Sequence, residues 1–328
     1  MPGSKPRATA WIAPFTLLAL APLSMPACGA PPQRVPASAD AAPAVAAPRA
    51  IVPLPHGRHG HRVEALPGGL LAFGGDDATD APDRGERACW WLADGAAVWQ
   101  RRADMNTGRD FFGAAMIDGE CYAIADGVER YDFAADCWVE VAPGGTLPVS
   151  HFGAAAVGHE LFVLGGYPIE CSAFFVADAA TGAIRRDEPP PGFQPGDHFH
   201  FLASIGGELH VAGGLDVETF RPRRQHFVRR GGAWHELPPP PDGLWAKFGG
   251  QAVVGGRWFL FGDFGAWLHD PAAPPAEQWR QCPSPPQVTA MPGTVAVGDS
   301  VWVLGGMHLD GGRARSIAFD LATLTWRN

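Results

Sequence analysis

Apolar positions along the chain recur in short runs separated by glycine-containing turns, and these runs form one repeated unit. Each unit has a short apolar segment, a tight turn, a second apolar segment and a pair of glycines. Short apolar runs bounded by turn residues predict β-strands. The second segment and its glycine pair recur at 70–75, 161–166, 209–214 and 301–306, with degenerate copies at 121–126 and 258–263.

A third predicted strand follows each glycine pair, and a large side chain then marks a fourth, outer strand. This position holds Trp99, Trp138, Trp234, Trp279 and Trp326, with Ile184 in the third copy. Unbroken apolar runs indicate strands that are covered on both faces, as in blades stacked around an axis. Six joint occurrences of strand, glycine pair, strand and outer tryptophan make this repeat a specific signal.

The combined pattern resembles the kelch repeat, and it covers residues 57–328. Segments 58–61 and 108–109 also resemble the loop motif that precedes the first strand in this family. The resemblance implies an all-β fold, a six-bladed kelch-type β-propeller of four-stranded antiparallel blades, over residues 51–328. Residues 51–54 look like a spare half-strand, and one interpretation is that they complete the last blade.

The spacing between repeats predicts where the variable loops lie. From each tryptophan to the next glycine pair the spacing is nearly constant, whereas from the pair to the tryptophan it varies widely. The variation therefore falls between the second and third strands of a blade. These loops open onto the same face as the connections between blades, so we expect that face to bind a partner.

The N-terminal segment resembles a bacterial export signal. Lys5 and Arg7 precede an apolar run over 11–23, which is too short and too interrupted by proline to span a bilayer. The segment ends in a lipobox-like sequence at Cys28, which predicts a signal peptide over 1–28 and a lipid anchor in the cell envelope, with the outer membrane expected. The alternative is ordinary cleavage that leaves a periplasmic or secreted protein. Residues 29–50 are rich in Ala and Pro and are predicted to be a tether.

Polar side chains gather at the predicted starts of the inner strands. A ring of mixed cations there could bind a carboxylate or phosphate through charge-assisted hydrogen bonds. The alternative is that these Arg and His side chains bond neighbouring backbone carbonyls. The candidate residues are Arg58, His61, Arg109, Asp110, His151, His198, His200 and Lys247.

Other chemistry has weaker support. Two imidazoles spaced as His198 and His200 could chelate a metal on a strand, but the sequence fixes no third ligand, so no metal and no cofactor are predicted. Cys121 and Cys137 lie in one blade and form a candidate disulfide, with buried free thiols as the alternative. The net charge of −9 argues against a nucleic-acid partner.

These observations favour an extracytoplasmic binding or scaffold module over an enzyme. Its expected partner is a protein or a glycan that binds the loop-rich face. We expect the chain to be a monomer that contacts the membrane only through the N-terminal lipid. The alternative is a sugar-active enzyme similar to sialic acid mutarotases, which would need a cationic axial pocket. A structural domain without a ligand is a third interpretation, because fold alone does not define function.

Overall fold

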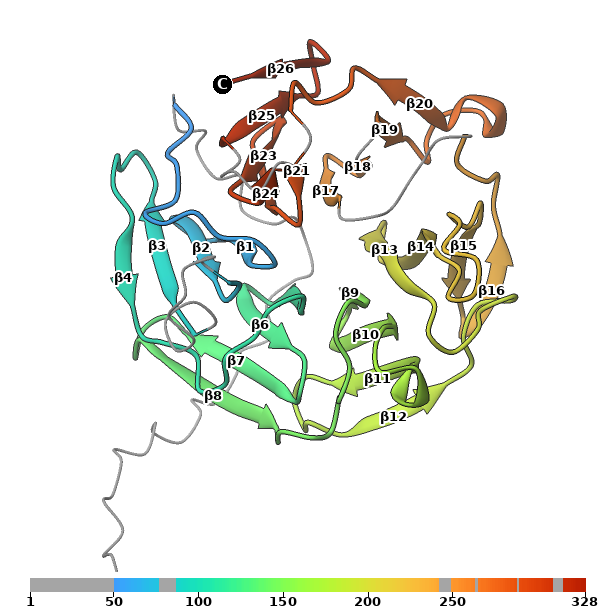
Figure 1. Ribbon diagram of the computed structural model, residues 1–328, viewed down its shortest axis with the longest axis horizontal. Helices are drawn as coiled ribbons and strands as arrows, with labels where there is room; N and C mark the ends of the chain where they lie inside the picture. The colour runs from blue at the N-terminus through green and yellow to red at the C-terminus, as the bar shows by residue number, and fades with distance from the viewer. Residues whose placement is uncertain (1–49, 77–86, 242–248, 263–264, 288, 309–314) are drawn as a thin grey trace, which may run out of the picture. The chain divides into compact units, whose positions relative to one another are not determined.

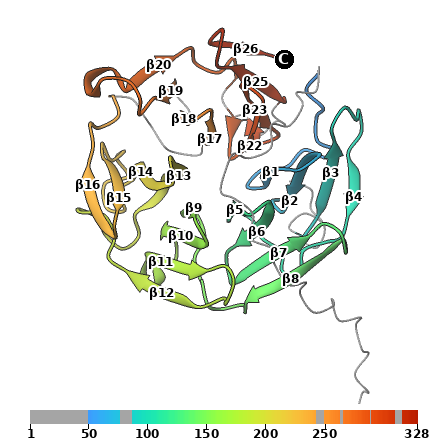
Figure 2. The same cartoon turned by 180° about the vertical axis from the view of Figure 1, so that it is seen from behind.

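Six four-stranded antiparallel sheets form from the described residues and are arranged as the blades of a β-propeller (Figures 1 and 2). The computed structural model describes residues 50–328 except 77–86, 242–248, 263–264, 288 and 309–314. The predicted signal peptide, Cys28, the tether up to residue 49 and Lys247 lie outside the described residues. Among the described residues, no helix has the length and apolar content to cross a membrane.

The strands of each blade follow one another in chain order from the axis outward (Figure 2). Blade 1 contains β1 (Arg62–Leu66), β2 (Gly69–Phe73), β3 (Cys89–Ala93) and β4 (Gln100–Arg102). Blade 2 contains β5 (Gly113–Ile117), β6 (Glu120–Ile124), β7 (Val128–Asp132) and β8 (Cys137–Ala142). Blade 3 contains β9 (Gly153–Val157), β10 (Glu160–Gly165), β11 (Ala173–Asp178) and β12 (Ile184–Asp187).

The remaining blades repeat this order. Blade 4 contains β13 (His198–Ile205), β14 (Glu208–Leu215), β15 (His226–Arg230) and β16 (Ala233–Glu236). Blade 5 contains β17 (Gly250–Val254), β18 (Arg257–Gly262), β19 (Gly265–His269) and β20 (Trp279–Cys282). Blade 6 contains β22 (Gly293–Val297), β23 (Ser300–Leu304), β25 (Ile317–Asp320) and β26 (Thr325–Arg327). Short elements between them are η1 (Ile169–Cys171), η2 (Pro275–Glu277), β21 (Thr289–Ala290) and β24 (Met307–His308).

Turns between the first and second strands are uniformly tight, as predicted. Asp118 and Gly119 have φ values of 51° and 78°, and Gly206 and Gly207 have values of 60° and 78°. Positive φ at both central residues is the type I′ geometry whose twist matches a two-residue hairpin. Connections between the second and third strands instead range from the two positions between Gly262 and Gly265 in blade 5 to residues 74–88 in blade 1. The predicted location of the variable loops is therefore confirmed.

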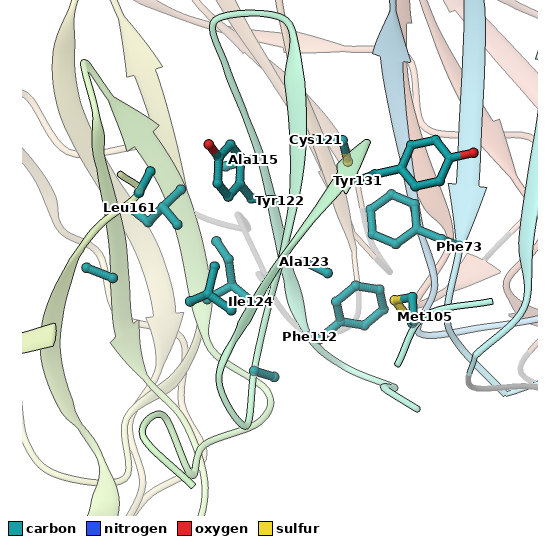
Figure 3. Packing of buried hydrophobic residues seen from close by; sticks show 14 of the residues in the cluster. Phe73, Met105, Phe112, Ala115, Cys121, Tyr122, Ala123, Ile124, Tyr131 and Leu161 are labelled. Atoms are coloured by element: carbon teal, nitrogen blue, oxygen red, sulfur yellow. The ribbon is translucent and has the colours of Figure 1, made fainter. Parts of the chain in front are cut away.

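The core consists of apolar side chains packed between neighbouring blades. Figure 3 shows Phe73, Phe112 and Tyr131 where blade 1 meets blade 2, with Tyr122 and Leu161 on the side of blade 2 that faces blade 3. All five side chains are at most 2% exposed, as in the core of a globular protein. Because each strand is covered on both faces, the inner strands need the unbroken apolar runs seen in the sequence.

In blades 2, 4, 5 and 6, the outer tryptophan donates a hydrogen bond to the connection that leaves the preceding blade. The indole N–H of Trp138 donates to the Ala103 carbonyl at 3.2 Å, and that of Trp234 donates to Glu188 at 2.9 Å. Trp279 and Trp326 make the same bond to Pro238 at 3.1 Å and Pro283 at 2.8 Å. The tryptophan thus contributes a hydrogen bond between neighbouring blades as well as an apolar side chain.

Ring closure differs from the interpretation that residues 51–54 complete the last blade. These residues form no strand, because β26 already supplies the fourth strand of blade 6 from the end of the chain. Instead, Trp99 donates its indole N–H to the Val52 carbonyl at 3.2 Å. The segment before blade 1 thus takes the part that a blade-to-blade connection plays elsewhere, and Ile51 and Leu54 pack against the apolar cluster between blades 6 and 1.

The predicted disulfide between Cys121 and Cys137 is not formed. Cys121 is a buried free cysteine, and burial raises the pKa of its thiol well above the ordinary value. Cys121 lies opposite Tyr131 on β7, whereas Cys137 pairs with Asp132 from the far side of that strand. The two cysteines are therefore two strands apart, beyond the reach of a disulfide.

Candidate functional site

A cavity of about 150 Å³ lies on the propeller axis, and residues of all six blades line it. The lining residues fall within 60–64, 111–114, 151–154, 199–201, 249–251 and 291–294. Each segment enters the first strand of its blade, so the cavity mouth lies on the face of the blade-to-blade connections. The second-to-third-strand loops reach the same face, since Ser150 bridges to Tyr167 and His59 to Asp76. The variable loops therefore surround the cavity mouth.

Backbone hydrogen bonds link successive blades around this mouth. The amide of Gly60 donates to the Met291 carbonyl at 2.8 Å, and the amide of Phe111 donates to Gly60 at 3.2 Å. His151 donates in turn to Phe111 at 2.9 Å, and Phe199 to His151 at 3.0 Å. All five residues have positive φ, between 47° and 66°. The chain takes this left-handed turn at each of these five positions, and the turns extend the series of hydrogen bonds from blade to blade.

Aromatic side chains occupy these left-handed positions at three blades. Glycine adopts positive φ without strain, as Gly60 does, whereas a bulky residue there costs about 1–3 kcal/mol. The rings of Phe111 and His151 stack with centroids 4.2 Å apart and planes at 13°. Phe199 meets His151 edge-on at 5.5 Å. The mouth therefore presents a connected aromatic surface at positions where an unstrained fold would use glycine.

Arg62 and Glu64 bring charge into the cavity from β1. The Arg62 Nε donates to the Phe112 carbonyl at 2.5 Å, which holds the guanidinium against blade 2. Burial raises the pKa of the Glu64 carboxyl to about 7, and the Arg62 guanidinium opposes this shift. Glu64 also lines a second cavity of about 270 Å³ between the inner strands, where alanines such as Ala114 and Ala154 leave space. Glu64 therefore stands where the two cavities meet.

Sequence reasoning did not select Arg62 or Glu64, although an alignment of the first strands could have done so. Arg62 lies opposite Phe73 at the start of the β1 ladder. Four of the other five ladders begin with glycine, at Gly113, Gly153, Gly250 and Gly293, and the ladder of blade 4 begins with His198. Two charged side chains in the first half of an inner strand, where four other blades begin with glycine, are the signal that could have identified them.

Two residues of the predicted cation ring hold the ends of second strands. Arg58 donates from an Nη atom to the Gly74 carbonyl at 2.5 Å, and Arg109 donates from Nε to the equivalent Ala125 carbonyl at 2.7 Å. Arg109 also pairs with Glu129 at 2.5 Å, and both arginines are at most 4% exposed. These contacts follow the alternative interpretation, in which loop arginines bond backbone carbonyls.

Two histidines of the predicted ring are packed between blades. His61 is fully buried, and burial lowers its pKa well below the usual value. His200 is 4% exposed, and burial lowers its pKa to about 3. A side chain at Gly214, which has φ of 98°, would meet the His200 ring at 2.4 Å. The glycine pair thus makes room for this imidazole.

His198 and His200 take separate environments. Phe199 between them has φ of 55°, which interrupts regular strand geometry. The Nδ1 of His198 lies 2.9 Å from the Gly196 carbonyl, and its Nε2 lies 3.3 Å from the Tyr167 hydroxyl. Within the described part of the chain, no cluster of three His, Cys, Asp or Glu residues has the arrangement of a metal site.

Of the predicted residues, His61, His151 and His200 line the cavity, and Asp110 immediately precedes the lining residue Phe111. The Nδ1 of His151 is 2.8 Å from the Ser150 hydroxyl. Burial lowers the pKa of His151, and the Asp110 carboxylate opposes this shift. Anion binding by the whole predicted set stays a prediction, and Lys247 lies outside the described residues.

Fold and cavity together define a six-bladed β-propeller with an axial site on its loop face. Among solved structures the chain is similar to that of YjhT, with a TM-score of 0.68 and 14% identity over 84% of this chain and 99% of that chain. At this identity the likeness shows the fold. No family model and no curated protein matches the sequence, so the kelch assignment rests on the repeat motifs.

Proposed function

We propose that this propeller is a binding module that takes a glycan at the axial mouth. The observation that carries the proposal is the aromatic surface of Phe111, His151 and Phe199, kept at positions of positive φ. A pyranose ring has an apolar C–H face that stacks on an aromatic ring and a rim of hydroxyls that needs hydrogen bonds. An aromatic surface above a cavity with a few polar groups supplies both.

Polar groups below the rings suit the hydroxyl rim. Glu64 and Arg62 line the cavity and offer an acceptor and donors within the same space. Gln251 is held in place, because its Nε2 donates to Leu202 at 2.7 Å and its Oε1 accepts from Trp258 at 3.1 Å. A site whose polar groups are fixed before binding loses little freedom when a ligand enters.

Glycine substitution at the mouth separates binding from folding. Phe111→Gly and Phe199→Gly remove a ring and relieve a strained φ, so we expect stability to change by no more than about 1 kcal/mol. Affinity for a sugar selected on a glycan array should fall at least tenfold in isothermal titration. Leu324→Gly is the matched control, because Leu324 also has positive φ, at 55°, but lies in the β25–β26 turn. Unchanged affinity in both mouth variants would refute the proposal.

A second candidate function is anomer interconversion of a sugar, in the manner of a mutarotase. The observation that favours it is Glu64, whose pKa burial raises to about 7 within the cavity. A carboxyl that titrates near neutral pH can both accept and return a proton. In mutarotation a base takes the proton of the anomeric hydroxyl, and an acid protonates the ring oxygen as the C–O bond opens.

Glu64→Gln distinguishes the two functions. A mutarotase would accelerate anomer interconversion, followed by NMR, and the variant would lose that acceleration while retaining the sugar. A binding module would show no acceleration above the uncatalysed rate in the unmodified protein.

We also propose that the propeller is carried outside the cytoplasm on a lipid attached to Cys28. The support is the sequence of residues 1–28, a basic start followed by an apolar run and a lipobox-like end. Labelled palmitate should enter the unmodified protein and not Cys28→Ala, and equal labelling of both would refute the anchor.

A further inference from the structure

We infer that the axial mouth is the inner end of an extended strip that binds an oligosaccharide across the loops of blades 3 and 4. This inference rests on the proposed glycan-binding function and adds the length and direction of the ligand. The strip, called the aromatic strip below, consists of the partly or fully exposed rings of Phe111, His151, Phe199, Tyr167 and Phe220, connected beneath the surface by the buried ring of His198, which is 3% exposed.

The rings of the aromatic strip form an unbroken series of contacts. From His151 at the mouth, the Tyr167 ring lies 5.9 Å away at 81°, and the His198 ring lies 4.7 Å beyond Tyr167. His198 is also 4.9 Å from Phe199, which joins the outer part of the strip to the mouth a second time. The Phe220 ring lies 6.3 Å from His198. The strip therefore leads from the axis to the tip of the β14–β15 loop.

Phe220 at the outer end is 63% exposed and is held there by its loop. The Asp216 carboxylate accepts the Thr219 amide and hydroxyl at 2.9 Å each, and the Phe220 amide donates to the Asp216 carbonyl at 2.9 Å. Arg223 then bridges Asp216 and the buried Asp197, at 2.9 Å to each carboxylate. The loop is thus built to present an aromatic ring to solvent, in one position.

Backbone strain marks four residues of the strip. Among the described residues other than glycine, every Phe or His at positive φ lies on the aromatic strip: Phe111, His151, Phe199 and Phe220. The other positive-φ positions hold aspartates, Met291 and Leu324. Strained residues persist where function requires their geometry. Because one device recurs from the axis to the loop tip, we treat the strip as one site rather than as separate side chains.

The dimensions of the strip favour a glycan over a protein. A protein interface centres on a broad apolar patch. Among the described residues, the large apolar side chains exposed in this region are Phe220 and Ile169, which is 46% exposed, and two such side chains do not form a broad patch. Glu218 and Arg221 on the β14–β15 loop are exposed and flank the aromatic ring with polar groups. A narrow apolar track with polar margins matches a row of sugar rings whose hydroxyls point sideways.

The test compares chain length with the outer ring present and absent. The probes are the best monosaccharide on a glycan array and the tetrasaccharide that contains it, titrated into the full-length protein, Phe220→Ala and Phe133→Ala. Phe133 is the control, since it is 38% exposed on the β7–β8 turn of blade 2, outside the strip. The tetrasaccharide should bind the unmodified protein more tightly than the monosaccharide. Phe220→Ala should weaken tetrasaccharide binding by roughly threefold to tenfold and leave monosaccharide binding unchanged.

Each other outcome is informative. Equal affinity for the two sugars, or an unaffected Phe220→Ala, overturns the strip and leaves a mouth-only site. Binding of no glycan on the array overturns the proposed function together with the strip. Phe220-dependent binding to a peptide library, without glycan binding, would assign this surface to a protein and also overturn the inference.

Discussion

Arg109 and Glu129 are joined within blade 2, with both side chains 3% exposed. Glu129 also accepts the backbone amides of Asn106 and Thr107, at 2.9 and 3.0 Å. Removing one member leaves an unpaired buried charge, so Arg109→Ala should lower the free energy of unfolding by about 3–5 kcal/mol in urea titration. Arg185→Ala is the control, because Arg185 is half exposed beside Glu160 and its loss should cost at most about 1 kcal/mol.

An opposite result would restore Arg109 as a ligand-binding residue. That result is an Arg109→Ala protein with the stability of the unmodified protein and a specific loss of anion affinity. At the residue scale, the sequence motif placed Arg58 and Arg109 at the loop face, but it did not show whether their side chains point to a ligand or to backbone carbonyls. The direction depends on carbonyls 16 positions further along the chain, which only the folded blade brings into reach.

At the scale of elements, hydrogen bonds from the outer tryptophans connect neighbouring blades. Trp234→Phe removes the indole N–H that reaches Glu188 while retaining an aromatic ring. We expect a loss of about 1 kcal/mol, and more if the smaller ring leaves a gap against Phe174, 5.4 Å away. Differential scanning calorimetry measures the change. A Trp234→Phe protein that melts at the original temperature would show that the hydrogen bond does not fasten blades 3 and 4.

Strands and tight turns were predictable because their periodicity is local. The two-residue turns follow from residues such as Asp118 and Gly119, which favour positive φ. Ring closure was not predictable in the same way, because Trp99 finds its acceptor at Val52, 47 positions earlier. Likewise, Phe111 and Phe199 look like ordinary strand residues in the sequence, and only the ring of backbone bonds reveals their positive φ.

Buried histidines give the whole molecule a pH dependence. Burial lowers the pKa of His200 and His226 to about 3, and of His210 and His269 to about 4. The last three cluster between blades 4 and 5, where His210 and His226 are 3.1 Å apart. These rings stay neutral in the folded protein, whereas the unfolded chain takes up protons below its ordinary histidine pKa of about 6.5.

Stability should therefore be constant above about pH 7 and fall as the pH drops from 6.5 towards 4. Each such histidine contributes up to about 2 kcal/mol to the loss at pH 5. Glu64 acts in the opposite sense, because its raised pKa means that protonation stabilises the folded state. This single carboxyl offsets only part of the stability that the four histidines lose. Urea midpoints at pH 7.5 and pH 5 measure the difference, and a higher midpoint at pH 5 would contradict it.

A crystal structure of the protein soaked with the array-selected sugar tests the central claim most directly, since it locates the ligand. We predict a sugar ring at the axial mouth, stacked on Phe111 or Phe199, with hydroxyls directed to Arg62 and Glu64. A sugar bound to the outer strands or to the face of the tight turns, with an empty axial cavity, would contradict the proposed site.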